Sequence, residues 1–311
     1  MLPIHFAPIQ GYTDCTYRAL HASLIGGIEE YYTPFVRWEK GDLRNKDRRD
    51  LDPSRNTHNT TAQIIFKDRD EFLRLTEQVM AIGWRKIDLN MGCPFPLQTH
   101  AGRGAGILQH PEIVEQIARE IAAIPEAAFS VKMRIGMAHE SEGMEILQIL
   151  SQAPLRHIVL HPRLGQQQYR GLAAKDAYAR FLNQSAHPMI YNGDLATPDE
   201  MHQIEQQFPA TAALMIGRGL MARPTLAVEY ADGKSLTPQQ QLSSVMKLHE
   251  GVYRHALENL QGEAQILSKL QSFWTPLEKM LDKKQFKALT KCGNLRKYRE
   301  ALPKQTAFGT N

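Results

Sequence analysis

Short apolar runs alternate with segments of helical period over about the first 230 residues of the chain. Each apolar run ends at a polar or glycine-containing turn, which is typical of buried strands joined to helices. Eight such units match the usual size of a (β/α)8 barrel, whereas a doubly wound sheet has fewer strands and a dinucleotide fingerprint. The eight expected strands are Ile4–Ala7, Glu30–Thr33, Ala62–Phe66, Lys86–Leu89, Phe129–Met133, His157–Leu160, Met189–Tyr191 and Ala213–Ile216.

Helices are expected in the connections between these strands. Apolar side chains recur at helical spacing from Phe72 to Ile82 and from Ile113 to Ile124. Proline favours the first turn of a helix, because the N–H groups there have no partner within the helix. Pro111 and Pro198 therefore mark two helix starts.

The pattern changes after Tyr230. A stretch rich in turn residues, from Ala231 to Pro238, predicts a linker, and no strand candidate follows it. We therefore expect two domains, a (β/α)8 TIM barrel at residues 1–236 and a small helical domain at residues 237–311. The apolar positions of the expected later helices are Leu242, Val245, Met246, His249 and Val252, then Leu257 and Leu260, then Ile266, Leu267 and Leu270.

Composition narrows the class of protein. A chain of 311 residues with 42% hydrophobic and 23% charged residues is typical of a soluble globular enzyme. Three cysteines without a Cys-x-x-Cys pair favour neither a disulfide framework nor a zinc site, so we expect a reducing, cytoplasmic location and no metal. The amino terminus lacks a basic stretch followed by an apolar core, and no apolar run approaches the roughly 20 residues of a membrane span. We expect neither membrane association nor a stable protein partner.

Basic residues concentrate at the end of the chain. From Thr237 to Asn311 there are twelve Lys and Arg against six Asp and Glu, whereas the rest of the chain carries 25 against 27. Such a surplus favours a polyanionic partner, although a solvated helix face gives the same pattern. The basic residues are Lys279, Lys283, Lys284, Lys287, Lys291, Arg296, Lys297, Arg299 and Lys304.

A cysteine lies in the stretch Ile87–Pro94, where alternating apolar residues give way to a polar turn. Gly92 permits unusual backbone angles and Pro94 cannot continue a strand ladder, so Cys93 is expected at the carboxyl end of a strand. That edge is the catalytic face of a (β/α)8 barrel, where a thiol is well placed to transfer a proton. A lone cysteine is also common as a small buried apolar residue, and this alternative stays open.

Glycine turns follow the last two strand candidates. Asn192, Gly193 and Asp194 follow the seventh, and Gly217 and Arg218 follow the eighth. The last strands of such barrels commonly build a phosphate site from backbone N–H groups, and a guanidinium can bind phosphate through two hydrogen bonds. These residues predict a phosphate site, although glycines at such positions also serve tight strand-to-helix turns.

Lys132 and His161 are further candidates on the strands. Lys132 lies within a strand between Val131 and Met133, and a charge that points into a barrel interior requires a strong reason. His161 follows the sixth strand candidate. Both could hold a cofactor, and for His161 a buried structural histidine is the alternative.

Six motifs resemble, in order, those of one enzyme family. Leu89–Pro94, which reads Leu-Asn-Met-Gly-Cys-Pro, resembles the active-site signature of the tRNA-dihydrouridine synthases, flavoenzymes that reduce uracil in transfer RNA. The resemblance covers about three quarters of the chain, and Thr33–Arg37 is most similar to the C subgroup. The other motifs are Ala7–Arg18, Val131–Gly136, His161–Arg163, Asn192–Asp194 and Met215–Gly219, and Gln63 matches as a single residue.

The resemblance implies a reaction in two halves. NADPH, or NADH, would reduce a bound FMN and leave, and tRNA would then bring in an extruded uridine. Hydride would pass to C6 of the uracil while a protonated Cys93 donates to C5. A lysine near the flavin would stabilise the negative charge of the reduced ring, which gives Lys132 a role. The implied FMN-binding residues are Ala7, Pro8, Ile9, Gln63, Lys132, His161, Asn192, Gly193, Asp194, Gly217 and Arg218, the implied substrate-binding residues are Asn90, Arg134 and Arg163, and the helical domain would bind tRNA.

Two other functions share parts of this pattern. A flavoenzyme like dihydroorotate dehydrogenase, acting on a free pyrimidine, would share the barrel and flavin, but the basic tail argues against it. An RNA-binding barrel without catalysis is the second, and the intact Cys93, Lys132 and Arg218 argue against that.

The stretch Gly102–Gly106 is similar to a nucleotide-binding loop. It lacks the third glycine at the required spacing and does not directly end a strand, so we expect it to shape the segment beside Cys93 instead. Phe95–His100 lacks the pair of lysines that some members of the resembled family carry.

Overall fold

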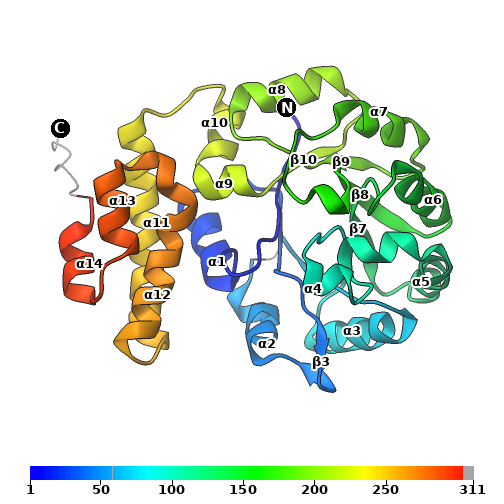
Figure 1. Cartoon of the computed structure of the whole chain (residues 1–311), viewed down its shortest axis with the longest axis horizontal. Coiled ribbons are helices and arrows are strands. Elements are labelled where there is room, and N and C mark those ends of the chain that lie inside the picture. Colours follow the sequence, from blue (N-terminus) through cyan, green and yellow to red (C-terminus); the bar gives the residue numbers. More distant parts are fainter. Residues whose placement is uncertain (58, 304–311) are drawn as a thin grey trace. The chain divides into compact units, whose positions relative to one another are not determined.

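The computed structural model describes residues 1–57 and 59–303 of the chain. Eight parallel strands close into a barrel in the order β1, β10, β9, β8, β7, β6, β5, β2 (Figure 1). All eight predicted strands are present, so the predicted (β/α)8 barrel is confirmed. The strands are β1 Ile4–Phe6, β2 Glu30–Tyr32, β5 Thr60–Ile64, β6 Lys86–Met91, β7 Ala128–Arg134, β8 Leu155–His161, β9 Met189–Tyr191 and β10 Ala213–Ile216.

Helices connect the strands and cover the outside of the barrel (Figure 1). The predicted starts at Pro111 and Pro198 are confirmed, since these prolines are the first residues of α5 and α8. The side chain of Asp68 caps α3 by accepting a hydrogen bond from the N–H of Glu71 at 2.8 Å. The barrel helices are α3 Arg69–Ile82, α4 Pro96–Thr99, α5 Pro111–Ala123, α6 Glu140–Leu150, α7 Lys175–Gln184 and α8 Pro198–Gln207, with 3-10 turns η1 Pro53–Arg55, η2 Gly104–Gln109 and η3 Gly165–Gln167.

The sequence pattern missed the elements between β2 and β5. Two antiparallel strands of two residues each, β3 Trp38–Glu39 and β4 Asp42–Leu43, turn at Lys40 and Gly41, whose φ angles are 52° and 87°. Strands this short carry no periodic signal, so only the glycine in the turn marked them. The helices α1 Cys15–Leu24 and α2 Asn45–Leu51 were missed as well.

Inside the barrel, the strands present alternate residues, as their two-residue period requires. Tyr32, Val159, Ile190 and Met215 belong to a buried apolar cluster in the barrel. On β6 and β7 the inward positions are polar instead, and they are cross-strand neighbours. The paired positions are Asp88 with Ser130 and Asn90 with Lys132.

The chain forms two compact units. One consists of residues 1–15, 28–195 and 199–217 and contains the barrel, and the other consists of residues 16–27, 196–198 and 218 onward. The second unit begins before the predicted boundary after residue 236, because α9 packs against η4 within that unit. Residues 304–311 of the predicted helical domain, with Lys304, lie outside the described residues. The elements after residue 217 are α9 Arg218–Ala222, α10 Leu226–Asp232, α11 Pro238–Asn259, α12 Glu263–Trp274, η4 Thr275–Met280, α13 Lys283–Thr290 and α14 Leu295–Ala301.

Buried aromatic residues hold α11, α12 and α14 together. The Tyr298 hydroxyl accepts a hydrogen bond from Trp274 Nε1 at 2.7 Å and lies 2.6 Å from His249 Nε2. Burial lowers the pKa of His249 to about 4, so the imidazole is neutral in this core. The prediction that Leu257 and Leu260 belong to a separate helix is wrong, because α11 continues to Asn259 and Leu257 is 45% exposed on it. Among the described residues, no helix is both long and apolar enough to cross a membrane.

Candidate active site

The loop that carries Cys93 starts at the carboxyl end of β6. Asn90, near the end of that strand, accepts hydrogen bonds at its Oδ1 from the N–H groups of Gly92 at 3.2 Å and Cys93 at 2.9 Å. The side chain of Asn90 thereby bends the backbone out of the strand and fixes the position of the thiol.

The glycine-rich stretch 102–106 packs against the Cys93 loop. The N–H of Ala105 donates to the carbonyl oxygen of Cys93 at 2.9 Å. Gly104 has a φ of 58°, and a Cβ there would lie 2.5 Å from the same oxygen, so only glycine fits. The glycine-rich stretch 102–106 therefore packs against the cysteine loop, as expected from the sequence, and does not form a nucleotide loop.

The thiol of Cys93 is half-buried. Burial raises its pKa, and this outweighs the hydrogen bond from the N–H of Phe95 and the positive charges of Arg134 and Lys132, which favour the thiolate. The group is therefore a protonated thiol at neutral pH, suited to donate a proton.

A row of hydrogen bonds supports Asn90 from inside the barrel. Asn90 Nδ2 donates to Gln63 Oε1 at 2.9 Å, and Gln63 Nε2 donates to Asp88 at 2.7 Å. Ser130 donates to the other oxygen of Asp88, also at 2.7 Å. Full burial raises the pKa of Asp88 to about 6, although these two donors and Lys132 favour the carboxylate. The row fixes the amide of Gln63, a predicted cofactor residue, with its oxygen toward Asn90.

Lys132 lies next to Asn90 on β7. Its Nζ donates to Asn192 Oδ1 at 2.7 Å, and Asn192 Nδ2 donates to the carbonyl oxygen of Met215 at 2.7 Å. Burial lowers the pKa of Lys132 to about 8, and the positive charge of Arg134 is the second cause of this shift. The structure thus brings two predicted cofactor residues, Lys132 and Asn192, into direct contact.

Arg134 joins the loops that follow β6 and β8. Its Nε donates to the carbonyl oxygen of Gly92 at 3.0 Å, and its Nη1 donates to that of Leu164 at 2.9 Å. The guanidinium also lies 5.6 Å from the ring centre of Tyr169. Arg134, predicted to bind substrate, is 1% exposed and holds the protein's own loops in position.

His161, Arg163 and Asp194 form a polar group at the ends of β8 and β9, in which His161 and Arg163 are buried and Asp194 is exposed. Arg163 pairs with the Asp194 carboxylate and donates from Nη2 to the carbonyl oxygen of Gly171 at 2.7 Å. Its Nη1 lies 3.0 Å from His161 Nε2. Because a guanidinium only donates, His161 Nε2 is the acceptor in this contact.

The remaining predicted cofactor residues lie at the carboxyl ends of β1, β9 and β10. The N–H of Ala7 donates to the carbonyl oxygen of Ile216 at 2.9 Å, and a Cβ on Gly217 would lie 3.3 Å from that of Ala7 and 3.4 Å from Ile9. A Cβ on Gly193 would lie 3.0 Å from that of Ala173. A side chain at either glycine would have to displace its neighbours by a few tenths of an ångström, so close packing favours glycine at both positions. Pro8 is half-buried, and Arg218 is exposed as the first residue of α9 in the second unit.

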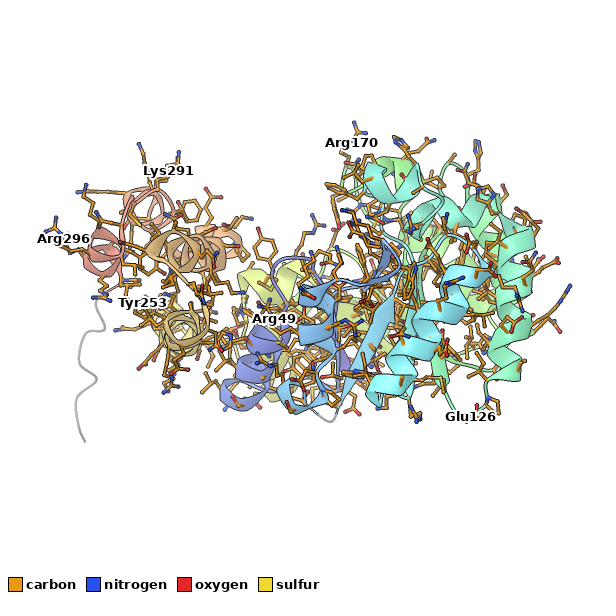
Figure 2. The ribbon with its side chains drawn as sticks, turned by 90° about the horizontal axis from the view of Figure 1, so that it is seen from below. Arg49, Glu126, Arg170, Tyr253, Lys291 and Arg296 are labelled. Atoms are coloured by element: carbon orange, nitrogen blue, oxygen red, sulfur yellow. The ribbon has the colours of Figure 1, made fainter. Side chains whose placement is uncertain are left out.

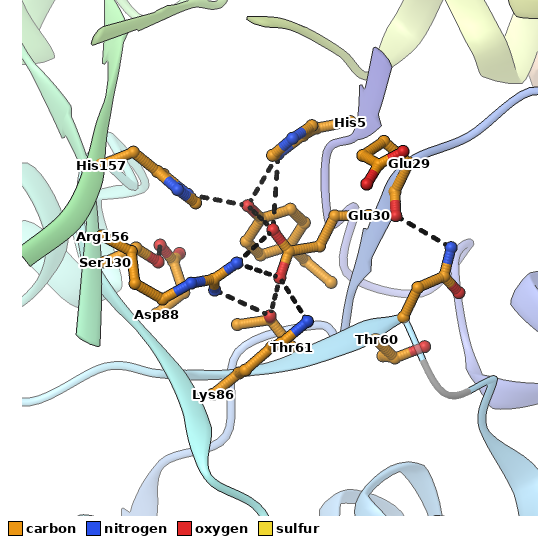
Figure 3. Close-up of polar contacts among 12 residues, drawn as sticks. His5, Glu29, Glu30, Thr60, Thr61, Lys86, Asp88, Ser130, Arg156 and His157 are labelled. Carbon is orange, nitrogen blue, oxygen red and sulfur yellow. Dashed lines mark hydrogen bonds and ion pairs between the residues drawn. The ribbon is translucent and has the colours of Figure 1, made fainter. Parts of the chain in front are cut away.

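A second polar cluster lies toward the amino-terminal ends of the strands (Figure 3). Ligand atoms of His5, Glu30 and His157 lie within 4.8 Å of one another, a spacing that could hold a metal ion. The Tyr32 hydroxyl, however, lies 2.9 Å from His5 Nδ1, 3.0 Å from His157 Nε2 and 3.3 Å from Glu30. Arg156 also donates to both oxygens of Glu30 at 2.9 Å. A hydroxyl among the ligand atoms and a guanidinium on the carboxylate satisfy this cluster without an ion, so it supports the barrel.

Sequence reasoning missed Asp88, Ser130 and Tyr169. A signal existed for the first two, because they lie two residues before Asn90 and Lys132 and so face the same side of their strands. Tyr169 lies in the loop after β8, where no local pattern marks a functional side chain.

Comparisons with known proteins agree on one family. A model of the family described as dihydrouridine synthase matches residues 5–308. The chain is 30% identical over 257 residues to tRNA-dihydrouridine synthase B of Yersinia pestis, a match that covers 80% of the chain and 78% of that protein. It is 28% identical over 239 residues to tRNA-dihydrouridine(16) synthase of Aquipseudomonas alcaligenes, covering 74% and 75%.

Among solved structures, histamine dehydrogenase from Rhizobium sp. 4-9 superposes on 79% of the chain with a TM-score of 0.50 and 12% identity. The chain spans about half of that protein, 48% of its length. This likeness supports the barrel fold alone.

Proposed function

We propose that this chain, which belongs to the dihydrouridine synthase family, reduces the C5–C6 double bond of uridines in tRNA to give dihydrouridine. The observation that carries the proposal is the position of Cys93 on the loop after β6, where Asn90 Oδ1 accepts a hydrogen bond from the backbone N–H of Cys93 at 2.9 Å. The names of the relatives from Yersinia pestis and Aquipseudomonas alcaligenes support tRNA as the substrate class. The cytoplasmic location and the similarity to the C subgroup stay predictions.

FMN is the proposed cofactor, with NADPH, or NADH, as its hydride source. The residues present fit a flavin in two respects. Lys132 offers a half-buried ammonium at the position that pairs with Asn90 across the strands, and Arg163 Nε is buried without an acceptor among the described residues. Lys132 would supply a cation, and Arg163 Nε an N–H donor, to the carbonyl oxygens and nitrogens of the flavin ring. The phosphate assignment to Gly193, Asp194, Gly217 and Arg218 rests on the sequence.

When bound, the flavin supplies the hydride that reaches C6 of the uracil. Cys93 Sγ donates its proton to C5, and burial keeps this proton on sulfur at neutral pH by raising the thiol's pKa. Asn90 uses its Oδ1 to hold the Cys93 loop and one Nδ2 hydrogen to bind Gln63. The second Nδ2 hydrogen of Asn90 remains for the uracil edge.

The basic helices α13 and α14 are the proposed tRNA-binding surface. Lys283 and Lys284 lie in the first turn of α13, which contains no acidic residue. The Asp282 carboxylate caps this end of the helix by accepting a hydrogen bond from the N–H of Gln285 at 2.9 Å, so the attraction for a phosphate comes from the lysine side chains. In Figure 2, Lys291 and Arg296 extend outward from the same unit.

The test uses purified, flavin-loaded protein, NADPH and tRNA isolated from cells that lack the gene. We expect tRNA-dependent NADPH oxidation and formation of dihydrouridine, measured by mass spectrometry of tRNA digests. If free uracil or orotate were reduced instead, the enzyme would be one like dihydroorotate dehydrogenase. Binding of tRNA without any reduction would favour an RNA-binding barrel without catalysis.

A further inference from the structure

Exposed apolar side chains gather on the loops that follow β6 and β8. Phe95 and Leu97 on the first loop are 62% and 75% exposed, and Tyr169 and Leu172 on the second are 55% and 86% exposed. Among the described residues, the other large apolar side chains that are exposed, Met1, Leu24 and Leu257, lie far apart in the sequence. Single exposed apolar residues are normal, but a group of them beside a candidate site marks a surface that a partner covers.

The backbone holds Phe95 and Leu97 in fixed positions. Prolines 94 and 96 flank Phe95, and its carbonyl oxygen accepts hydrogen bonds from the N–H groups of Gln98 at 2.8 Å and Thr99 at 3.0 Å. A Cβ on Gly106 would lie 2.5 Å from the oxygen of Thr99, so η2 packs tightly against this short helix. The two apolar side chains therefore reach solvent from a segment whose backbone is already ordered, which lowers the entropy cost when a partner binds.

This segment begins two residues after the reacting group, since only Pro94 separates Phe95 from Cys93. The N–H of Phe95 favours the thiolate form of Cys93, so it acts on the pKa of that thiol. Arg134 donates to the carbonyl oxygen of Gly92 and lies over the ring of Tyr169. The same guanidinium therefore contacts both the cysteine loop and the second apolar loop.

Resting on the proposed function, we propose that Phe95 and Leu97 form an apolar wedge that contacts the RNA bases next to the target uridine. A uridine must leave the base stack before a thiol can reach its C5, and its departure exposes the apolar faces of its neighbours. Phenylalanine and leucine are side chains that proteins insert between bases, and stacking on an aromatic ring is independent of base identity. The stretch Phe95–Thr99 contains no charged side chain, so it contributes stacking and not phosphate binding.

The test is a series of substitutions at one exposed position, Phe95→Ala, Phe95→Leu and Phe95→Trp, with Leu257→Ala as the control for an exposed apolar residue elsewhere. The rate of reoxidation of the reduced, flavin-loaded enzyme by tRNA is measured in single turnover. We expect Phe95→Ala to be slower by roughly 5- to 100-fold, the range of one base–aromatic stack, Phe95→Leu to be intermediate, and Phe95→Trp to equal or exceed the wild type. Leu257→Ala should match the wild type.

A second measurement is independent of catalysis. In Phe95→Trp, tRNA should quench indole fluorescence beyond the change seen in the wild type, because the new ring stacks on a base. The wedge is overturned if Phe95→Ala reacts at the wild-type rate. It is also overturned if Trp does not restore the Ala loss, or if flavin reduction by NADPH falls equally, because either result indicates damage to the Cys93 loop. If the wild type forms no dihydrouridine, it is the proposed function that fails.

Discussion

At the scale of single residues, the polar side chains around Cys93 mostly bind one another. Arg134 and Arg163, predicted to bind substrate, are 1% and 2% exposed, and the guanidinium of each is bound by backbone carbonyl oxygens or by Asp194. They position the loops that carry the reacting groups. Cys93 is half-buried and burial raises the pKa of its thiol, which is why we propose it as the proton donor.

Cys93→Ala should slow the reduction of uridine by roughly 100- to 10,000-fold, the usual contribution of a general acid. Flavin reduction by NADPH should be unchanged, because the thiol acts only on the substrate carbon. Stopped-flow absorbance of the flavin separates the two half-reactions. Reoxidation of the mutant by tRNA at the wild-type rate would remove Cys93 from the mechanism.

Lys132 should make the stability of the flavin-free protein depend on pH in a defined direction. Its pKa falls from 10.5 to about 8 on folding, so between these pH values the unfolded chain keeps a proton that the folded chain has lost. The free-energy cost of burying this lysine is complete below pH 8 and disappears as the pH rises to 10.5. Lys132→Met should therefore raise the free energy of unfolding at pH 7 by up to about 3 kcal/mol. The lost hydrogen bond to Asn192 should reduce this gain by about 1 kcal/mol.

Urea unfolding of the wild type and Lys132→Met at pH 7 and pH 10 measures this difference. We expect the advantage of the variant to shrink toward the higher pH. A difference that does not vary with pH would show that the lysine keeps its proton in the folded protein.

At the scale of elements, the spacing of apolar residues was enough to predict the buried strands. It was not enough to predict the short elements. The eight barrel strands carry apolar runs, and Pro111 and Pro198 mark helix starts, so these were predictable. The hairpin of β3 and β4 has two-residue strands, too short for any period. Leu257 was assigned to the wrong helix because an apolar residue can also lie on the solvent side of a long helix.

The contacts within the candidate site were predictable only in part. Residue types at strand ends indicated Cys93 and His161, and a charge within a strand indicated Lys132. The pairing of Arg163 with Asp194 and of Lys132 with Asn192 joins positions 31 and 60 residues apart, and a single sequence carries no signal for such distances.

Gly104→Ala tests how η2 supports the cysteine loop. An alanine Cβ would lie 2.5 Å from the Cys93 carbonyl oxygen, so the loop must shift, and we expect uridine reduction to fall at least about 10-fold while the barrel folds. Gly102→Ala is the matched control, because Gly102 also has a positive φ of 73° but its Cβ would meet no atom closer than 3.8 Å. Circular dichroism and single-turnover rates provide the comparison. Equal rates in the two variants would mean that the contact with Cys93 has no role.

At the scale of the whole molecule, the two compact units have different chemistry. The barrel unit carries the thiol, the lysine and the buried polar row, and the unit that follows carries the basic surplus of the chain. Uracil is too small to supply the affinity for a chosen uridine, so we expect the phosphates around it to provide most of the binding energy.

Replacing Lys283, Lys284 and Lys287, which are exposed on α13, with Gln should weaken tRNA binding. The slope of log affinity against log salt should become shallower by about 2 to 3, because each phosphate contact contributes roughly 0.7 to 0.9. Fluorescence titrations at several salt concentrations measure both quantities. Arg119→Gln, an exposed charge on α5, is the control, and flavin content should be the same in all proteins. An unchanged slope in the triple variant would show that this face is merely solvated.

The central claim is that the chain forms dihydrouridine in tRNA with the thiol of Cys93. The most direct measurement is the sequencing of dihydrouridine positions in tRNA from cells that lack the gene, complemented with the wild type or with Cys93→Ala. We predict that at least one position loses dihydrouridine in the deletion, regains it with the wild type and stays unmodified with the variant. An unchanged dihydrouridine map in the deletion strain would contradict the account.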